Sequence, residues 1–117
     1  MRVLVADRLS EDALDEMRTF GVDVMYDPTL TPELLPVALD GVNVLVVRGT
    51  EVSESAIRAG RSLNLIIRAG AGVSNIDVAL ASERGIYVAN CPGKNASGVA
   101  ELTWALITAL DRRVPDS

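Results

Sequence analysis

Residues 64–77, NLIIRAGAGVSNID, join an apolar run to a glycine-containing turn and then to the start of a helix. Gly70 and Gly72 allow backbone conformations with φ > 0 and let a ligand approach main-chain N–H groups. Those donors, the N-terminus of the following helix and the guanidinium of Arg68 all favour a carboxylate or a phosphate. The stretch therefore predicts an anion site at the end of a strand. A tight turn with a surface arginine is the alternative.

The same stretch imitates a dinucleotide-binding fingerprint without completing it. Counting G-x-G-x-x-G from Gly70 places Asn75 where the third glycine belongs. About 20 residues further on, where an acid for the ribose is expected, the chain has Asn90. We therefore reject a nicotinamide-binding fingerprint here.

Short apolar strands alternate with capped helices along the chain. The run at 43–47, NVLVV, is typical of a strand that is covered on both faces of a parallel sheet. Five strand–helix units predict an α/β fold in which one doubly wound, five-stranded parallel sheet forms a single domain. The expected strands are 2–6, 22–26, 43–47, 63–67 and 86–88, and the expected helices begin at Ser10, at Thr31-Pro32, at Ser53, at Asp77 and at residue 96.

Ligand sites of such sheets lie at the carboxyl ends of the strands. Those ends are residues 7–8, 48–50, 68–70 and 90–92. Arg48 and Arg68 follow neighbouring strands, so we expect them to converge on one crevice and to bind an anion.

Composition narrows the function classes. The chain has 117 residues, a net charge of −5, one cysteine (Cys91) and no histidine, which excludes an internal disulfide and the usual zinc ligand sets. No basic stripe carries interleaved aromatic residues, so we expect no nucleic-acid partner. No apolar stretch is long enough for a membrane span and no secretory signal is present, so a soluble cytoplasmic protein is expected.

The segment 96–113 predicts the longest helix and has little polar surface. Its apolar residues are Val99, Leu102, Trp104, Leu106, Ile107 and Leu110. Because a helix that is apolar nearly all round is buried, we expect another domain or a second copy of the chain to cover it.

Three segments together resemble the N-terminal half of the D-isomer-specific 2-hydroxyacid dehydrogenases, and among them most closely the phosphoglycerate dehydrogenases. They are VVRGTEVSESAI (46–57), LIIRAGAGVSNIDVALASERGIYVANCPG (65–93) and NASGVAELTWALITALDRRVP (95–115). The resemblance implies a flavodoxin-like substrate-binding domain over 1–95. It also implies an interdomain helix over 96–117 that leads to an NAD-binding domain of the same protein, absent from this chain.

The resemblance also implies site roles. Arg48 and Arg68 would hold the phosphate and carboxylate end of a small anionic substrate, and the N–H groups of Ala69, Gly70 and Ala71 would contact the carboxylate. Ala71, Asn95 and Ser97 would lie near the cofactor. Ala71 and Ser74 depart from a threonine and an aspartate common in related enzymes.

The implied activity is NAD-dependent oxidation of 3-phosphoglycerate to 3-phosphohydroxypyruvate in serine biosynthesis. No catalytic residue is assigned to this chain, because the histidine acid of the family is missing, and we expect the chain by itself to be inert and not to bind NAD. The alternatives are a glyoxylate or hydroxypyruvate reductase, or a stand-alone anion-binding module that associates through 96–113. A phosphorelay receiver and a flavodoxin fit poorly, because Arg48 replaces an acid and residues 7–12, DRLSED, contain no glycine.

Overall fold

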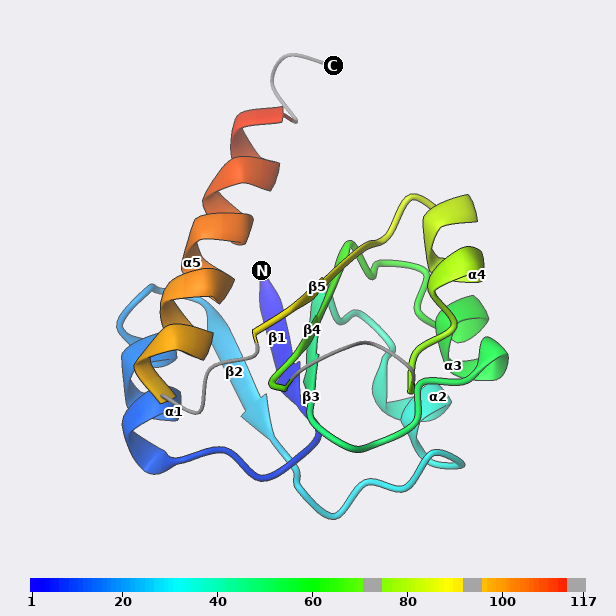
Figure 1. Cartoon of the computed structure of the whole chain (residues 1–117), viewed down its shortest axis with the longest axis horizontal. Helices are drawn as coiled ribbons and strands as arrows, with labels where there is room; N and C mark the ends of the chain where they lie inside the picture. The colour runs from blue at the N-terminus through cyan, green and yellow to red at the C-terminus, as the bar shows by residue number, and fades with distance from the viewer. Residues whose placement is uncertain (71–74, 92–95, 114–117) are drawn as a thin grey trace.

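The computed structural model describes residues 1–70, 75–91 and 96–113, with side chains described over 98–109 in the last range. These residues form five strands and five helices in strict alternation (Figure 1). The strands are β1 (Arg2–Val5), β2 (Asp23–Tyr26), β3 (Val44–Val47), β4 (Leu65–Arg68) and β5 (Tyr87–Asn90). The helices are α1 (Glu11–Arg18), α2 (Leu35–Ala38), α3 (Glu54–Ala59), α4 (Val78–Glu83) and α5 (Ala96–Arg113).

All four strand pairings are parallel, and the order of the strands in the sheet is β2-β1-β3-β4-β5. This is the flavodoxin-like order, so the predicted fold class is confirmed. The order reverses direction between β1 and β3, and the two carboxyl ends there flank the crevice in which this class of sheet usually binds ligands.

Helices cover both faces of the sheet. In Figure 1, α1 and α5 lie on one side and α2, α3 and α4 on the other. Because side chains alternate along a strand, each strand contributes to both cores: Val44 and Val46 pack toward Leu14 of α1, whereas Leu45 and Val47 pack toward α2 and α3. β3 is buried along its whole length, as its apolar sequence predicts.

Three of the predicted helix starts are confirmed in atomic detail. The side chains of Ser10, Ser53 and Asp77 each accept a hydrogen bond from the backbone N–H three residues further on, at 3.2, 3.5 and 3.2 Å. Each cap pairs an N–H group that the helix itself cannot satisfy. The caps thereby fix where α1, α3 and α4 begin.

The predicted helix start at Thr31-Pro32 is wrong. The carbonyl oxygen of Thr31 accepts the N–H groups of Leu34 and Leu35 at 3.0 and 3.1 Å, which makes a turn, and α2 begins only at Leu35. Pro36 occupies the first turn of the helix, where a missing N–H costs nothing. The helix thus uses the second proline of this stretch, although no capping side chain precedes it as Thr31 precedes Pro32.

Helix α5 is buried on one side and exposed on another. Val99, Ala100, Thr103 and Ile107 are buried against the sheet and α1, whereas Trp104 stays 43% exposed and stacks on Phe20 at a centroid distance of 4.8 Å. The described residues therefore cover only one side of α5, and the expectation that another domain or a second copy of the chain covers the other side stays a prediction. Over that same part of the chain, no helix combines the length and the apolar character that a membrane span requires.

Candidate functional site

The two predicted arginines lie side by side at the carboxyl edge of the sheet. The β3–β4 register pairs Val47 with Arg68, so Arg48 is the next residue beyond the paired end of β3. The side chain of Arg68 is half-buried, and its Nε–H donates to the carbonyl oxygen of Arg48 at 2.9 Å. Arg48 is exposed. The sheet therefore brings the two residues together, with Arg68 braced against the main chain that carries Arg48.

Gly70 serves a different purpose from the one expected. Its φ is not positive, so the left-handed conformation predicted for this turn is absent at Gly70. A Cβ placed on Gly70 would lie 3.6 Å from the Cζ and from one terminal nitrogen of Arg68. The missing side chain leaves space directly over the guanidinium, and a ligand could approach the guanidinium there. Gly72 lies outside the described residues.

The main-chain N–H groups that follow β4 already have partners. The N–H of Ala69 donates to the carbonyl oxygen of Val47 at 2.8 Å and so extends the β3–β4 ladder. The N–H of Gly70 donates to the carbonyl oxygen of Arg68 at 3.0 Å in a three-residue turn. Both N–H groups are therefore bonded within the protein in this structure, and their expected contacts with a substrate carboxylate stay predictions.

The loop at 48–50 is held by a residue that the sequence did not single out as a site residue. One carboxylate oxygen of Asp7, Oδ2, accepts the N–H of Arg48 at 2.6 Å and the N–H of Thr50 at 2.9 Å. Asp7 lies just beyond β1, on the opposite side of the reversal in strand order. Its position at a strand end is visible in the sequence, but its partners lie more than 40 residues away.

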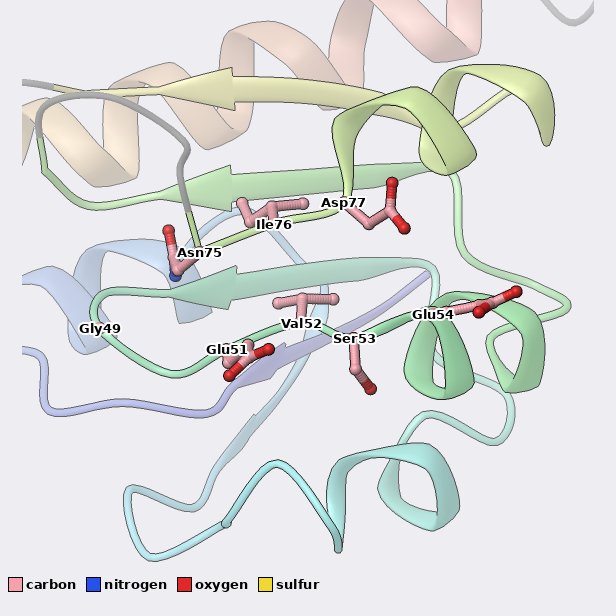
Figure 2. A pocket seen from close by; sticks show the side chains of 8 residues that line it. All are labelled: Gly49, Glu51, Val52, Ser53, Glu54, Asn75, Ile76 and Asp77. Carbon is pink, nitrogen blue, oxygen red and sulfur yellow. The ribbon is translucent and has the colours of Figure 1, made fainter.

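Asn75 holds the same loop from the other side. Its Nδ2 donates to the carbonyl oxygen of Thr50 at 2.7 Å and approaches that of Arg48 at 3.5 Å. Figure 2 shows the amide nitrogen turned toward this loop and the oxygen turned away from it. The oxygen is buried and accepts no hydrogen bond within the described structure. From the sequence, Asn75 was noted only because it stands where a dinucleotide-binding fingerprint would have its third glycine.

A cavity of about 630 Å³ opens beside this loop (Figure 2). It runs from the carboxyl edge of the sheet toward the starts of α3 and α4, and it is lined by Gly49, Glu51, Val52, Ser53, Glu54, Asn75, Ile76 and Asp77. Three of these residues are acidic and neither arginine is among them, so the cavity itself does not suit an anion. Within the described ranges, no cluster of His, Cys, Asp and Glu side chains could hold a metal ion.

The side chains of three predicted site residues, Ala71, Asn95 and Ser97, are not described. Ala71 and Asn95 lie outside the described residues, as does Ser74. Ser97 lies in α5, but its side chain is outside the description. The geometry of the site therefore rests on Arg48, Arg68, Gly70 and the two residues that hold the loop, Asp7 and Asn75.

Residues 3–114 match the family described as D-isomer specific 2-hydroxyacid dehydrogenase, catalytic domain. The chain belongs to that family. The 2-hydroxyacid dehydrogenases are oxidoreductases, and the expected family membership is confirmed along almost the whole chain.

Individual relatives agree with this assignment. The chain is 41% identical to D-3-phosphoglycerate dehydrogenase of Archaeoglobus fulgidus over all of its own length and 22% of the relative's. It is 41% identical to hydroxypyruvate reductase of Thermotoga maritima over 97% of its length and 37% of the relative's. The solved NAD+-bound 3-phosphoglycerate dehydrogenase of Entamoeba histolytica superposes with a TM-score of 0.73 and 31% identity, over 87% of this chain and 36% of that one. The chain thus spans about a fifth to a third of these relatives' lengths.

Proposed function

We propose that residues 1–95 are the substrate-binding domain of an NAD-dependent D-3-phosphoglycerate dehydrogenase, and that 96–117 form the helix that leads to its NAD-binding domain. The observation that carries the proposal is the pairing of Arg48 and Arg68 at adjoining strand ends, in a chain 41% identical to such an enzyme over its whole length. Substrates of this class carry both a phosphate and a carboxylate. Two guanidinium groups at one edge match two anionic groups on one ligand.

In this proposal Arg68 binds one anionic group of the substrate. Its Nε–H is committed to the Arg48 carbonyl oxygen, which fixes the plane of the guanidinium. Gly70 keeps the space above that plane open. Arg48, exposed at the next strand end, supplies the second cation, and the N–H of Gly70 adds a donor once its turn bond is exchanged. Ala71 is proposed to contact the substrate carboxylate through its main-chain N–H group.

The described residues do not fit NAD itself. A dinucleotide pyrophosphate needs a glycine-rich turn with unoccupied N–H donors after a strand. After β1 the chain has DRLSED, and the Asp7 carboxylate already occupies the N–H groups of Arg48 and Thr50 at the reversal of strand order. We therefore assign to these residues the binding and orientation of the hydroxy acid, with the NAD cradle in the second domain. Ala71, Asn95 and Ser97 are proposed to face that cofactor.

The test of the binding role uses the full-length protein encoded by the gene. Arg68→Ala should raise KM for D-3-phosphoglycerate by about tenfold or more, the effect of losing a charged hydrogen-bonding partner. Arg84→Ala removes the same charge at the opposite edge of the sheet, just before β5, and should leave KM within about twofold of wild type. An unchanged KM in Arg68→Ala would remove the proposed role.

Hydroxypyruvate reduction is the second candidate, because the Thermotoga relative is equally similar. The two candidates differ in the phosphate group, so kcat/KM for phosphohydroxypyruvate and for hydroxypyruvate separates them. A preference for the phosphorylated acid that disappears in Arg48→Ala supports the first candidate. Equal rates with both acids in the wild type support the second.

Two further expectations remain proposals. The 117-residue chain should show no turnover with NADH and phosphohydroxypyruvate. Measurable turnover would contradict the proposal that this chain is inactive by itself. The exposed Trp104 face of α5 is proposed to be covered by the second domain or by another copy of the chain. Light scattering across a concentration series distinguishes self-association from a monomer.

A further inference from the structure

Asp7 binds two main-chain N–H groups at the carboxyl edge of the sheet. It lies two residues beyond the end of β1 and is half-buried. A single oxygen of its carboxylate accepts the N–H of Arg48 at 2.6 Å and the N–H of Thr50 at 2.9 Å. One acceptor therefore joins two alternate amides of the loop that carries Arg48.

The contact between Asp7 and the 48–50 loop joins the carboxyl ends of β1 and β3. β1 and β3 are the strands between which the strand order reverses, and ligands of this fold class usually bind in the crevice between their ends. Main-chain N–H groups that point into such a crevice form a ready site for an anion. Here the protein fills that site with a carboxylate of its own.

The other side chains that hold the loop contact its carbonyl groups. Arg68 Nε–H donates to the Arg48 carbonyl oxygen, and Asn75 Nδ2 donates to that of Thr50. Within the described residues, the N–H side of the loop is bonded to Asp7. The position of the Arg48 main chain therefore depends on contacts from both sides, and Asp7 provides those on the β1 side.

We propose that Asp7 is a positioning residue for anion binding: its carboxylate holds the 48–50 loop so that Arg48 stays beside Arg68. The inference rests on the proposed function for the identity of the ligand, a small hydroxy acid with two anionic groups. Asp7 does not touch that ligand in this account. It acts through the main chain of Arg48.

Removing the Asp7 side chain has two effects on the Kd for the anionic ligand, and they have opposite signs. A carboxylate near an anion site repels the ligand, so loss of the charge alone strengthens anion binding. Loss of the two hydrogen bonds releases the loop and weakens anion binding. The sign of the change in Kd therefore tells the two effects apart.

The experiment titrates D-3-phosphoglycerate into the full-length protein, into three aspartate variants, and into Arg48→Ala and Arg68→Ala. Asp7→Ala removes both hydrogen bonds and should raise Kd about tenfold or more, whereas Asp7→Asn keeps a neutral oxygen acceptor and should raise it about threefold. Asp27→Ala is the matched control. Asp27 follows β2 and is also half-buried, and among the described residues its side chain accepts hydrogen bonds from the N–H and the hydroxyl of Thr29, at 3.1 and 2.6 Å. It should leave Kd within about twofold.

Two additional readouts exclude a general loss of structure. Amide hydrogen exchange in Asp7→Asn should accelerate at Arg48 and Thr50 while the buried amides of β3 and β4 keep their wild-type protection. Added formate should partly restore binding in Asp7→Ala by occupying the released amides. If Asp7→Ala fails to fold, Asp7→Asn and its exchange pattern decide the outcome.

The outcomes separate the inference from the function on which it rests. If Arg68→Ala weakens binding but both Asp7 variants bind the ligand as well as or better than wild type, the positioning role is overturned. If neither arginine variant changes Kd, the proposed function fails. The exchange rates at Arg48 and Thr50 still test Asp7 in that case, and unchanged rates would overturn its role.

Discussion

Asn75→Asp exchanges a donor for an acceptor without changing the shape of the side chain. In the wild type the amide nitrogen of Asn75 donates to the Thr50 carbonyl oxygen at 2.7 Å. The contact with the Arg48 carbonyl oxygen at 3.5 Å is at the limit of a hydrogen bond and contributes little. A carboxylate oxygen in the same place would face the Thr50 carbonyl with no proton between them.

The expected magnitude follows from these contacts. Asn75→Ala loses one neutral hydrogen bond but also deletes a buried oxygen that accepts no bond within the described residues, so we expect the free energy of unfolding to fall by about 1 kcal/mol. Asn75→Asp loses the same bond and adds a partly buried charge without a partner, so a loss of about 2–4 kcal/mol is expected at pH 7. A loss of that size lowers Tm by roughly 4 °C for each kcal/mol in a domain of this length.

Urea unfolding of the 117-residue chain, followed through the fluorescence of its single tryptophan, measures the difference. Burial without a partner raises the pKa of the introduced carboxyl above its usual value of about 4, so as the pH falls from about 6 to about 4 the folded protein takes up a proton there. The proton restores a donor toward Thr50, and the deficit should shrink toward that of Asn75→Ala. Asn64→Asp makes the same exchange at an exposed side chain and should change stability by less than about 0.5 kcal/mol. The reasoning is refuted if Asn75→Asp is no less stable than Asn75→Ala at pH 7, or if their difference does not depend on pH.

Three other substitutions test the described backbone and packing. Gly98→Ala should stabilise the chain by about 0.5–1 kcal/mol, because among the described residues its Cβ would meet the Cys91 sulfur at an ordinary 3.5 Å and alanine favours the helix; a loss of stability would contradict the packing of α5. Gly85→Ala should cost about 1–2 kcal/mol, because Gly85 has φ +74°, and an unchanged Tm would argue against that conformation. Phe20→Ala should cost about 1–2 kcal/mol and shift the emission of Trp104, which stacks on Phe20; an unchanged spectrum would show that the rings do not stack.

The local signals in the sequence predicted the fold well. Ser10, Ser53 and Asp77 are caps whose hydrogen bonds span three residues, so the information for each helix start lies within one turn. The apolar run at 43–47 predicted a strand buried on both faces for a similarly local reason. The start of α2 was missed because it has no capping side chain, whereas the stronger local signal at Thr31-Pro32 gives only a turn.

The site was predictable only in part. The proximity of Arg48 and Arg68 was predictable, because the carboxyl ends of neighbouring parallel strands lie at the same edge of the sheet. The contacts of Asp7 with the 48–50 loop span 41 and 43 residues and depend on the register of β1 and β3, which no local pattern encodes. The same holds for Asn75, whose partner Thr50 is 25 residues away. Gly70 was predicted for its backbone freedom, but the structure uses its missing side chain.

The most direct test of the central claim is a crystal structure of the full-length protein with NAD and D-3-phosphoglycerate. The account predicts that phosphate or carboxylate oxygens of the ligand lie within hydrogen-bond distance, about 3.2 Å, of the guanidinium groups of Arg48 and Arg68. A ligand bound with its anionic groups away from both arginines, or inside the cavity lined by Glu51, Glu54 and Asp77, would contradict it.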